Sequence, residues 1–180
     1  YPGYQFHSVA HYRVFKGIVF EDEASPAYLL ELAETSKTAD QISFLGKISS
    51  QDEAGNQRFH YQAGITLRKS AEEQPRLGTF DLATRDDIPG ENLYQSNLLF
   101  HGPCFQGVQK ILQISSTGLT TACFLPREIG DLLGQFPVDS FNPLLADVHL
   151  QSLLIWSHYQ LGSIGLPLSI QGAVQYKIPP

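Results

Sequence analysis

The sequence predicts an α+β fold in which antiparallel strands wrap around a central helix. Three observations lead to this prediction: alternating apolar runs within residues 41–67, a long apolar segment at residues 142–158, and strand-like sequence from residue 166 onward. Alternation puts every second side chain on one face of a strand, whereas a segment that is apolar on nearly every face suits a buried helix. Strands, a buried helix and further strands describe a sheet that covers a helix.

The first half of the chain is predicted to form strands. Residues 5–20 are rich in β-favouring side chains, and residues 41–67 are predicted to form a hairpin around the polar turn Gln51–Asn56. Residues 26–34 are ambiguous, because Leu, Glu and Ala favour a helix while the alternation of Tyr28, Leu30 and Leu32 favours a strand. We expect a strand there.

Residues 69–97 change in character, with acidic pairs, prolines and few large apolar side chains. So long a stretch without regular structure is unusual inside one compact unit. We therefore expect a linker between two units in tandem, residues 1–68 and residues 98–180. The second unit is predicted to contain a hairpin formed by residues 106–116 and 118–125.

A short segment near Arg127–Phe136 leads to the apolar helix of residues 142–158. Asn142 can cap this helix, and Pro143 suits the first helical position, where its missing N–H costs nothing. Leucines, Ile155 and Trp156 occur on nearly every face, so we expect the helix to be buried all round.

Asp147 and Gln151 are the polar residues in this apolar helix that point to chemistry. Four residues apart, they lie on one face, with the carboxylate within reach of the amide. An apolar wall should raise the pKa of Asp147, as a general acid requires near neutral pH. The alternative is that an Asp near a helix start merely interacts favourably with the helix dipole.

Composition limits the classes of partner and compartment. A net charge of −6 disfavours nucleic acid and anionic membrane surfaces, and no apolar run approaches the roughly 20 residues that span a bilayer. Cys104 and Cys123 are too few for a disulfide framework or a zinc knuckle, so we expect a cytoplasmic protein without a metal site. No Met occurs, and both ends read as strand, so we expect an excerpt of a longer chain.

Three motifs in the second half resemble those of dehydratase domains in polyketide and polyunsaturated-fatty-acid synthases. They are the LFHGPCFQG segment at residues 99–107, the DVHLQ segment at residues 147–151 and the LPLSI segment at residues 166–170. The first resembles the (Y/H)GPxFQG segment of that family, the second its DxxxQ helix motif and the third its LPxS strand. The order and spacing of the three carry the resemblance.

The resemblance implies a double hotdog, in which two sheets each wrap a helix, with the first hotdog incomplete here. It also implies that Asp147 protonates the departing hydroxyl of a 3-hydroxyacyl thioester and that Gln151 orients Asp147. The residues that it places against the substrate are His101, Gly102, Pro103, Phe105 and Pro167.

The family's catalytic His belongs to an HxxxGxxxxP motif in the first hotdog. His7 and His11 lack the Gly and Pro that follow at this spacing, so we expect the catalytic His to lie upstream of Tyr1. The 180 residues are then expected to carry only the acid half of the site. We expect His158 to lie in the core or at the end of a tunnel, and Cys104 and Cys123 to pack as small apolar residues.

The predicted function is dehydration of a 3-hydroxyacyl chain, carried on the phosphopantetheine arm of an acyl carrier protein, to the 2-enoyl thioester. No dissociable cofactor is expected, since the thioester itself acidifies the α-proton. The expected partners are the carrier protein, neighbouring synthase domains and a second copy in a homodimer. The alternatives are a non-catalytic hotdog that scaffolds the synthase or docks carrier protein, and a hotdog thioesterase or cyclase-like domain.

Overall fold

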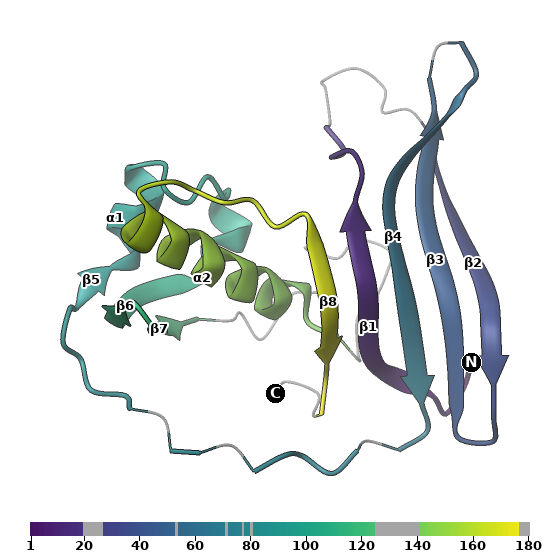
Figure 1. The fold of residues 1–180 in the computed structure, drawn as a ribbon, viewed down its shortest axis with the longest axis horizontal. Helices are drawn as coiled ribbons and strands as arrows, with labels where there is room; N and C mark the ends of the chain where they lie inside the picture. Colours follow the sequence, from purple (N-terminus) through teal and green to yellow (C-terminus); the bar gives the residue numbers. More distant parts are fainter. Residues whose placement is uncertain are drawn as a thin grey trace. The chain divides into compact units, whose positions relative to one another are not determined.

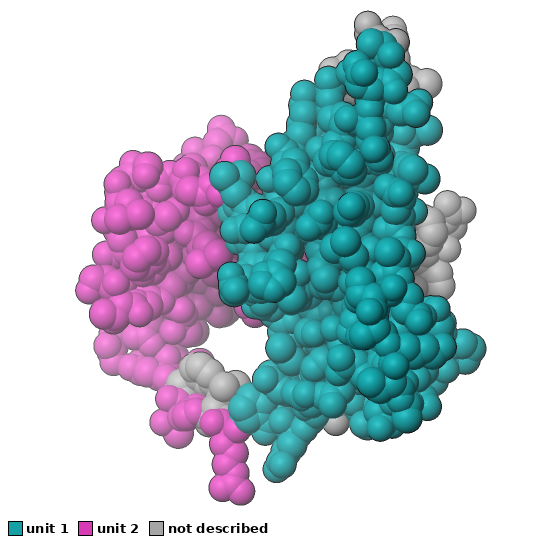
Figure 2. All heavy atoms as spheres, turned by 45° about the vertical axis from the view of Figure 1, so that its right-hand side comes forward, with its two compact units in different colours: residues 1–75, 167–178 teal, residues 76–166, 179–180 magenta. Residues whose placement is uncertain are grey.

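The computed structural model describes residues 1–19, 27–52, 54–70, 72–76, 78–79, 81–124 and 141–176. The chain divides into two compact units, coloured separately in Figure 2. Unit 1 consists of Tyr1–Pro75 and Pro167–Ile178, and unit 2 consists of Arg76–Leu166 with Pro179–Pro180. No helix in the described ranges combines the length and apolarity needed to cross a bilayer.

Unit 1 is built on one five-stranded antiparallel sheet with the strand order β2-β3-β4-β1-β8 (Figure 1). Its strands are β1 (Gln5–Val14), β2 (Tyr28–Lys37), β3 (Gln41–Gln51), β4 (Gln57–Arg68) and β8 (Ser169–Val174).

The β3–β4 hairpin confirms the prediction for residues 41–67. Its turn is closed by the Asp52 carboxylate, which accepts hydrogen bonds from the backbone N–H groups of Ala54 and Asn56. The ambiguous residues 26–34 also form a strand within the described part, since β2 pairs with β3 along its length. Backbone pairing with a neighbouring strand outweighs the helix propensity of Leu, Glu and Ala.

The last strand corrects the prediction that residues 98–180 form one unit. β8 pairs with β1 in the unit 1 sheet, with Ser8 opposite Val174 and Arg13 opposite Ser169. Two further backbone bonds extend the pairing, from Val14 N to Leu168 O and from Gln175 N to His7 O. One edge of β1 already pairs with β4, and β8 satisfies the N–H and C=O groups of its other edge.

The described part of unit 2 contains a three-stranded sheet, three helical segments and a compact apolar core. The strands, in the order β5-β6-β7, are β5 (Ile88–Pro89), β6 (Val108–Ser115) and β7 (Gly118–Cys123), and the helical segments are α1 (Gly90–Gln95), the 3₁₀ turn η1 (Pro103–Phe105) and α2 (Pro143–Leu161). The core consists of Leu93, Leu98, Leu99, Val108, Ile111, Val148, Leu154 and Ile155. The predicted hairpin of residues 106–125 is confirmed as β6–β7.

The expected linker of residues 69–97 is wrong over its second half. β5 and α1 lie inside that range, and Leu93 is 3% exposed in the unit 2 core. Residues 85 and 86 also donate their backbone N–H groups to Leu112 O, alongside β6. Few large apolar residues suffice here because Leu93 is buried in the core and Tyr94 packs against it. The segment near Arg127–Phe136 lies outside the described residues.

α2 begins and ends as its sequence predicts. The Asn142 side chain accepts hydrogen bonds from Leu144 N and Leu145 N, Pro143 occupies the first helical position, and Gly162 ends the helix in the left-handed conformation at φ 67°. The predicted all-round burial is wrong, because the buried residues form one stripe: Leu144, Val148, Gln151, Leu154 and Ile155. Leu153 and Leu161 on the remaining surface are more than half exposed.

Close packing between α1 and β6 requires glycine at position 90. A Cβ atom built on Gly90 would lie 1.9 Å from the backbone oxygen of Val108. We predict that Gly90→Ala lowers the free energy of unfolding by about 3 kcal/mol, because backbone overpacking outweighs the gain of about 1 kcal/mol in helix propensity. Urea unfolding measures this. Gly78→Ala, whose Cβ meets nothing within 4 Å, is the control; equal loss in both variants would contradict the prediction.

Candidate active site

Asp147 and Gln151 are brought together on the face of α2 that packs against the rest of unit 2. The Gln151 Nε2 group donates a hydrogen bond to Asp147 Oδ2 at 2.6 Å. Gln151 is fully buried, while 24% of the Asp147 side chain remains exposed. Asp147 lies beyond the first turn of α2, where the effect of the helix dipole has already fallen off. Its position therefore calls for another explanation than the dipole.

Both polar atoms of the Gln151 amide are hydrogen-bonded: Nε2 donates twice and Oε1 accepts once. Besides Asp147, its Nε2 donates to the backbone oxygen of Phe105 at 2.7 Å, and its Oε1 accepts from the hydroxyl of Tyr94 at 2.8 Å. Phe105 O can only accept a hydrogen bond, so the amide nitrogen must face this atom. The neighbours thus determine which way the amide points.

Tyr94, on α1, connects this amide to the sheet. Its hydroxyl oxygen accepts a hydrogen bond from the backbone N–H of Val108 at 3.0 Å while its proton goes to Gln151. Burial raises the pKa of Tyr94 above its ordinary value, and the nearby Asp147 and Cys123 add to this, although the Val108 N–H opposes it. The phenol therefore stays protonated and remains a donor.

The LFHGPCFQG segment owes its shape to the turn that presents the Phe105 carbonyl. Phe105 N donates to Gly102 O and Gly107 N donates to Phe105 O, each at 2.9 Å. A Cβ on Gly107 would lie 2.6 Å from Val148 Cγ2, so glycine lets the turn approach α2 closely. The segment then delivers a backbone acceptor to Gln151, while the Phe105 ring is 42% exposed.

His101 is the second ionisable side chain beside Asp147. Its Nε2 lies 3.6 Å from Asp147 Oδ2, slightly beyond hydrogen-bonding distance, and its ring stacks on Phe100 with centroids 4.7 Å apart. Its Nδ1 is buried and has no hydrogen-bond partner among the described residues. An N–H on Nε2 is attracted to the carboxylate, whereas a lone pair there would be repelled, so the proton of the neutral ring belongs on Nε2.

Asp147 Oδ1 differs from Oδ2 in having no donor among the described side chains and backbone groups. A hydrogen bond donated to one carboxyl oxygen favours the electron-rich form of that oxygen. When Asp147 is protonated, its proton is therefore best held on Oδ1. The arrangement can present one acidic O–H to a bound molecule.

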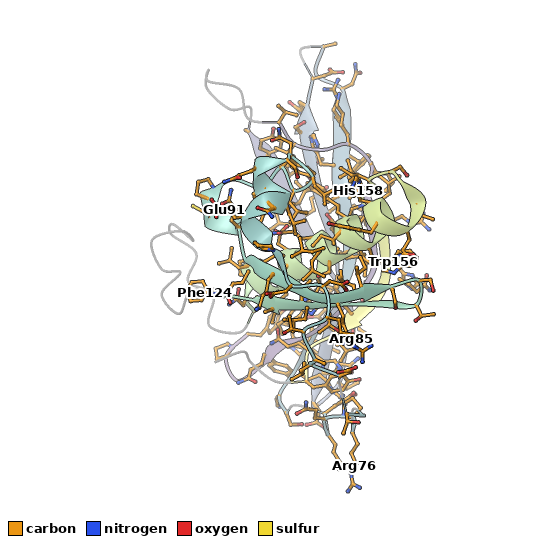
Figure 3. All side chains as sticks on the ribbon, turned by 90° about the vertical axis from the view of Figure 1, so that its left-hand side faces the viewer. Arg76, Arg85, Glu91, Phe124, Trp156 and His158 are labelled. Carbon is orange, nitrogen blue, oxygen red and sulfur yellow. The ribbon has the colours of Figure 1, made fainter. Side chains whose placement is uncertain are left out.

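Tyr94 also lines an open hollow of about 430 Å³. Its lining consists of Glu91, Tyr94, Gln95, Gln106 and Val108, and Figure 3 labels Glu91 on α1. Within the described ranges, no group of three or more His, Cys, Asp or Glu side chains could hold a metal ion.

The structure brings most of the residues predicted from the sequence into this cluster. His101, Gly102, Pro103 and Phe105 lie in or beside the turn that faces α2. Pro167 belongs to unit 1; its place against the substrate stays a prediction.

Sequence reasoning missed Tyr94 and the backbone N–H of Val108. Tyr94 lies in residues taken for a linker, and a backbone donor leaves no trace in the sequence. The Pro89-Gly90 pair followed by Leu93 could have indicated a short helix there.

The spacing HxxxGxxxxP, expected upstream of Tyr1, does occur within the chain, at His158, Gly162 and Pro167. Gly162 serves as the left-handed end of α2, and its N–H donates to His158 O at 2.9 Å. His158 is eleven residues after Asp147 on the same helix, about 16 Å along the axis at roughly 1.5 Å per residue. The two side chains are therefore too far apart to act on neighbouring carbon atoms of one substrate. The match at His158 reflects the glycine that ends α2 and does not mark a catalytic His.

His158 is also exposed, which corrects the expected place in the core or at a tunnel end. Its neighbour Trp156 donates its indole N–H to Ser115 O on β6, and the two positions lie on nearly opposite sides of α2 (Figure 3). Cys104 and Cys123 are exposed as well, so the expected burial of both is wrong.

Comparison with known proteins gives the family. Residues 83–180, more than half of the chain, match the family model described as "Polyketide synthase dehydratase N-terminal domain". The chain belongs to the polyketide synthase dehydratase family. The resemblance seen in residues 99–107, 147–151 and 166–170 is confirmed, and the match includes α1, η1 and α2.

Relatives of this dehydratase-family chain include a polyunsaturated fatty acid synthase subunit from Thraustochytrium sp. (strain ATCC 26185 / S-3). The two are 26% identical over 188 residues, which is 100% of this chain and 6% of the relative. The chain thus spans a small part of that protein.

Two solved structures with the same fold are dehydratase domains of the Curacin polyketide synthase. The domain from the CurK module has a TM-score of 0.70 at 20% identity, covering 99% of this chain and 63% of that one. The domain from the CurF module has a TM-score of 0.69 at 16% identity, covering 97% and 62%. The predicted α+β hotdog architecture is confirmed by these likenesses.

The raised pKa of Tyr94 predicts a pH dependence of stability. Because the folded state holds this proton more tightly than the unfolded chain, the contribution is complete below the ordinary pKa of 10.0 and is lost as pH rises through the raised value. The difference in unfolding free energy between wild type and Tyr94→Phe should therefore be constant below pH 10.0 and shrink as the pH rises above it. Urea unfolding at several pH values measures it; a constant difference contradicts the prediction.

Proposed function

We propose that this chain supplies the general acid of a dehydratase that acts on a 3-hydroxyacyl thioester. In this reaction a base removes the proton from C2, and the electron pair of that C–H bond forms the C2=C3 double bond. The C3–O bond breaks, and the departing oxygen takes a proton from Asp147 to leave as water. The products are the 2-enoyl thioester and water, with Asp147 left as a carboxylate.

The observation that carries the proposal is the asymmetry of the Asp147 carboxyl group. Oδ2 accepts the 2.6 Å hydrogen bond from a fully buried and fully oriented amide, whereas Oδ1 has no described donor. This supports a carboxyl whose proton sits on Oδ1, pointing to where a hydroxyl could leave. The Gln151 hydrogen bond then stabilises the carboxylate that forms as the proton departs.

The proposed base is a His from the HxxxGxxxxP motif of the first hotdog, as the resemblance implies. His158 lies too far along α2 from Asp147 to take this role. Two further structures similar to this chain are of inactive mutants of the CurK dehydratase, one with His replaced by Phe and one with Asp replaced by Asn. The inactivity of these two mutants supports a mechanism that needs one residue of each kind.

The proposed substrate is carried by an acyl carrier protein, and the proposed setting is a multidomain synthase. The relationship to a polyunsaturated fatty acid synthase supports both. A 3-hydroxyacyl thioester suits the site because its carbonyl acidifies the C2 proton, which leaves the departure of the hydroxyl as the step that needs an acid.

The direct test is Asp147→Asn in the full-length protein. An amide cannot supply the proton, so we predict a fall in turnover on the order of 10²- to 10⁴-fold with the fold unchanged. Formation of the enoyl thioester from a 3-hydroxyacyl thioester, followed by its absorbance, is the measurement.

The matched control for this substitution is Asp87→Asn. Asp87 is an exposed carboxylate of unit 2 that pairs with Lys110 and lies outside the cluster. The Asp87→Asn variant should retain wild-type turnover. Undiminished dehydration by Asp147→Asn, or an equal loss in both variants, rules out the acid role.

A further inference from the structure

We infer that Tyr94 is a positioning residue for the acid, acting through Gln151 to keep the Asp147 proton on Oδ1. This inference rests on the proposed function and extends it to a side chain on a different helix. The connection between Tyr94 and Asp147 is indirect: it runs from Val108 N–H to the Tyr94 hydroxyl, then to Gln151 Oε1, and from Gln151 Nε2 to Asp147.

The buried oxygen of the Gln151 amide depends on the Tyr94 hydroxyl for its hydrogen bond. Gln151 Oε1 has one described donor, the Tyr94 hydroxyl, and the amide is wholly buried. Without that donor, Oε1 would be buried and unpaired, and the amide would gain by rotating toward another donor. Rotation would weaken the bonds from Nε2 to Asp147 Oδ2 and Phe105 O.

The backbone N–H of Val108 makes the Tyr94 proton point at Gln151. The hydroxyl oxygen accepts the N–H of Val108 at 3.0 Å, and this backbone group belongs to the first residue of β6. Since Val108 N can only donate, the single Tyr94 proton is directed to Gln151. The sheet thereby determines the orientation of a side chain on α2.

The amide in turn acts on the acid. A firm N–H bond to Oδ2 favours the carboxylate and keeps the proton off that oxygen. A loosened amide makes the two oxygens more alike, so it no longer keeps the proton on Oδ1. Loss of the Tyr94 hydroxyl should therefore lower the rate of proton delivery.

The ionisable groups around this chain of bonds come from several elements. His101 lies before η1, with its Nε2 3.6 Å from Asp147 Oδ2. Cys123 on β7 contributes to the raised pKa of Tyr94. Glu91 on α1 lines the same hollow as Tyr94. None of the three donates to Gln151 Oε1 in the described structure. Removing the Tyr94 hydroxyl therefore tests whether the orientation of the Gln151 amide matters for catalysis.

The experiment uses Tyr94→Phe in the full-length protein, which keeps the ring and removes the hydroxyl. We expect kcat for dehydration to fall on the order of 10- to 100-fold with little change in KM, because the acid is misplaced and substrate contacts are kept. Tyr159→Phe, an exposed tyrosine of α2, should match wild type in both.

A double-mutant cycle with Gln151→Leu separates positioning from a structural role. If Tyr94 acts through Gln151, adding Tyr94→Phe to Gln151→Leu should lower kcat by less than about twofold further. Multiplicative losses in kcat, or a Tyr94→Phe variant with wild-type kcat, overturn the inference. Circular dichroism and urea unfolding establish that the variants fold.

Failure of this inference is distinguishable from failure of the proposed function. If Asp147→Asn is inactive and the losses in the cycle are multiplicative, only the positioning role of Tyr94 is contradicted. If Asp147→Asn is fully active, the acid role of Asp147 and the positioning role of Tyr94 are both contradicted.

Discussion

The buried amide of Gln151 is the interaction on which the site depends. An amide in an apolar core is tolerated when its donors and acceptor are all paired, because an unpaired polar group costs several times what a hydrogen bond contributes. Here the partners are Asp147, the Phe105 carbonyl and the Tyr94 hydroxyl, which come from α2, η1 and α1. Pairing this one group therefore requires three elements of unit 2 to meet at one point.

Two glycines make that meeting sterically feasible. Gly90 lets the start of α1 touch the Val108 carbonyl, and Gly107 lets the turn after η1 touch Val148 on α2. Each contact brings a hydrogen-bonding group to Gln151: α1 carries Tyr94, and the turn carries the Phe105 carbonyl. Packing and hydrogen bonding thus specify the same geometry. Asp147 stays partly exposed at the edge of this arrangement, where its free oxygen can meet a substrate.

Local patterns predicted the local structure well. Alternation gave the β3–β4 hairpin, and Asn142, Pro143 and Gly162 bound α2 as their conformational preferences require. The i,i+4 spacing of Asp147 and Gln151 identified the central pair of the site. Pairing of β8 with β1 and the packing of α1 were missed because they depend on contacts between distant residues. Tyr94 was missed for the same reason, since its partners Val108 and Gln151 are 14 and 57 residues away.

The measurement that tests the account most directly is a crystal structure of the full-length protein with a 3-hydroxyacyl pantetheine amide, whose less acidic C2 proton slows elimination. The quantity of interest is the distance from each Asp147 oxygen to the oxygen on C3. The account predicts that Oδ1 lies about 3 Å or less from that oxygen, as a proton donor must, with Oδ2 still bound to Gln151 Nε2. A C3 oxygen bound to Oδ2 in place of Gln151, or beyond about 5 Å from both oxygens, would contradict it.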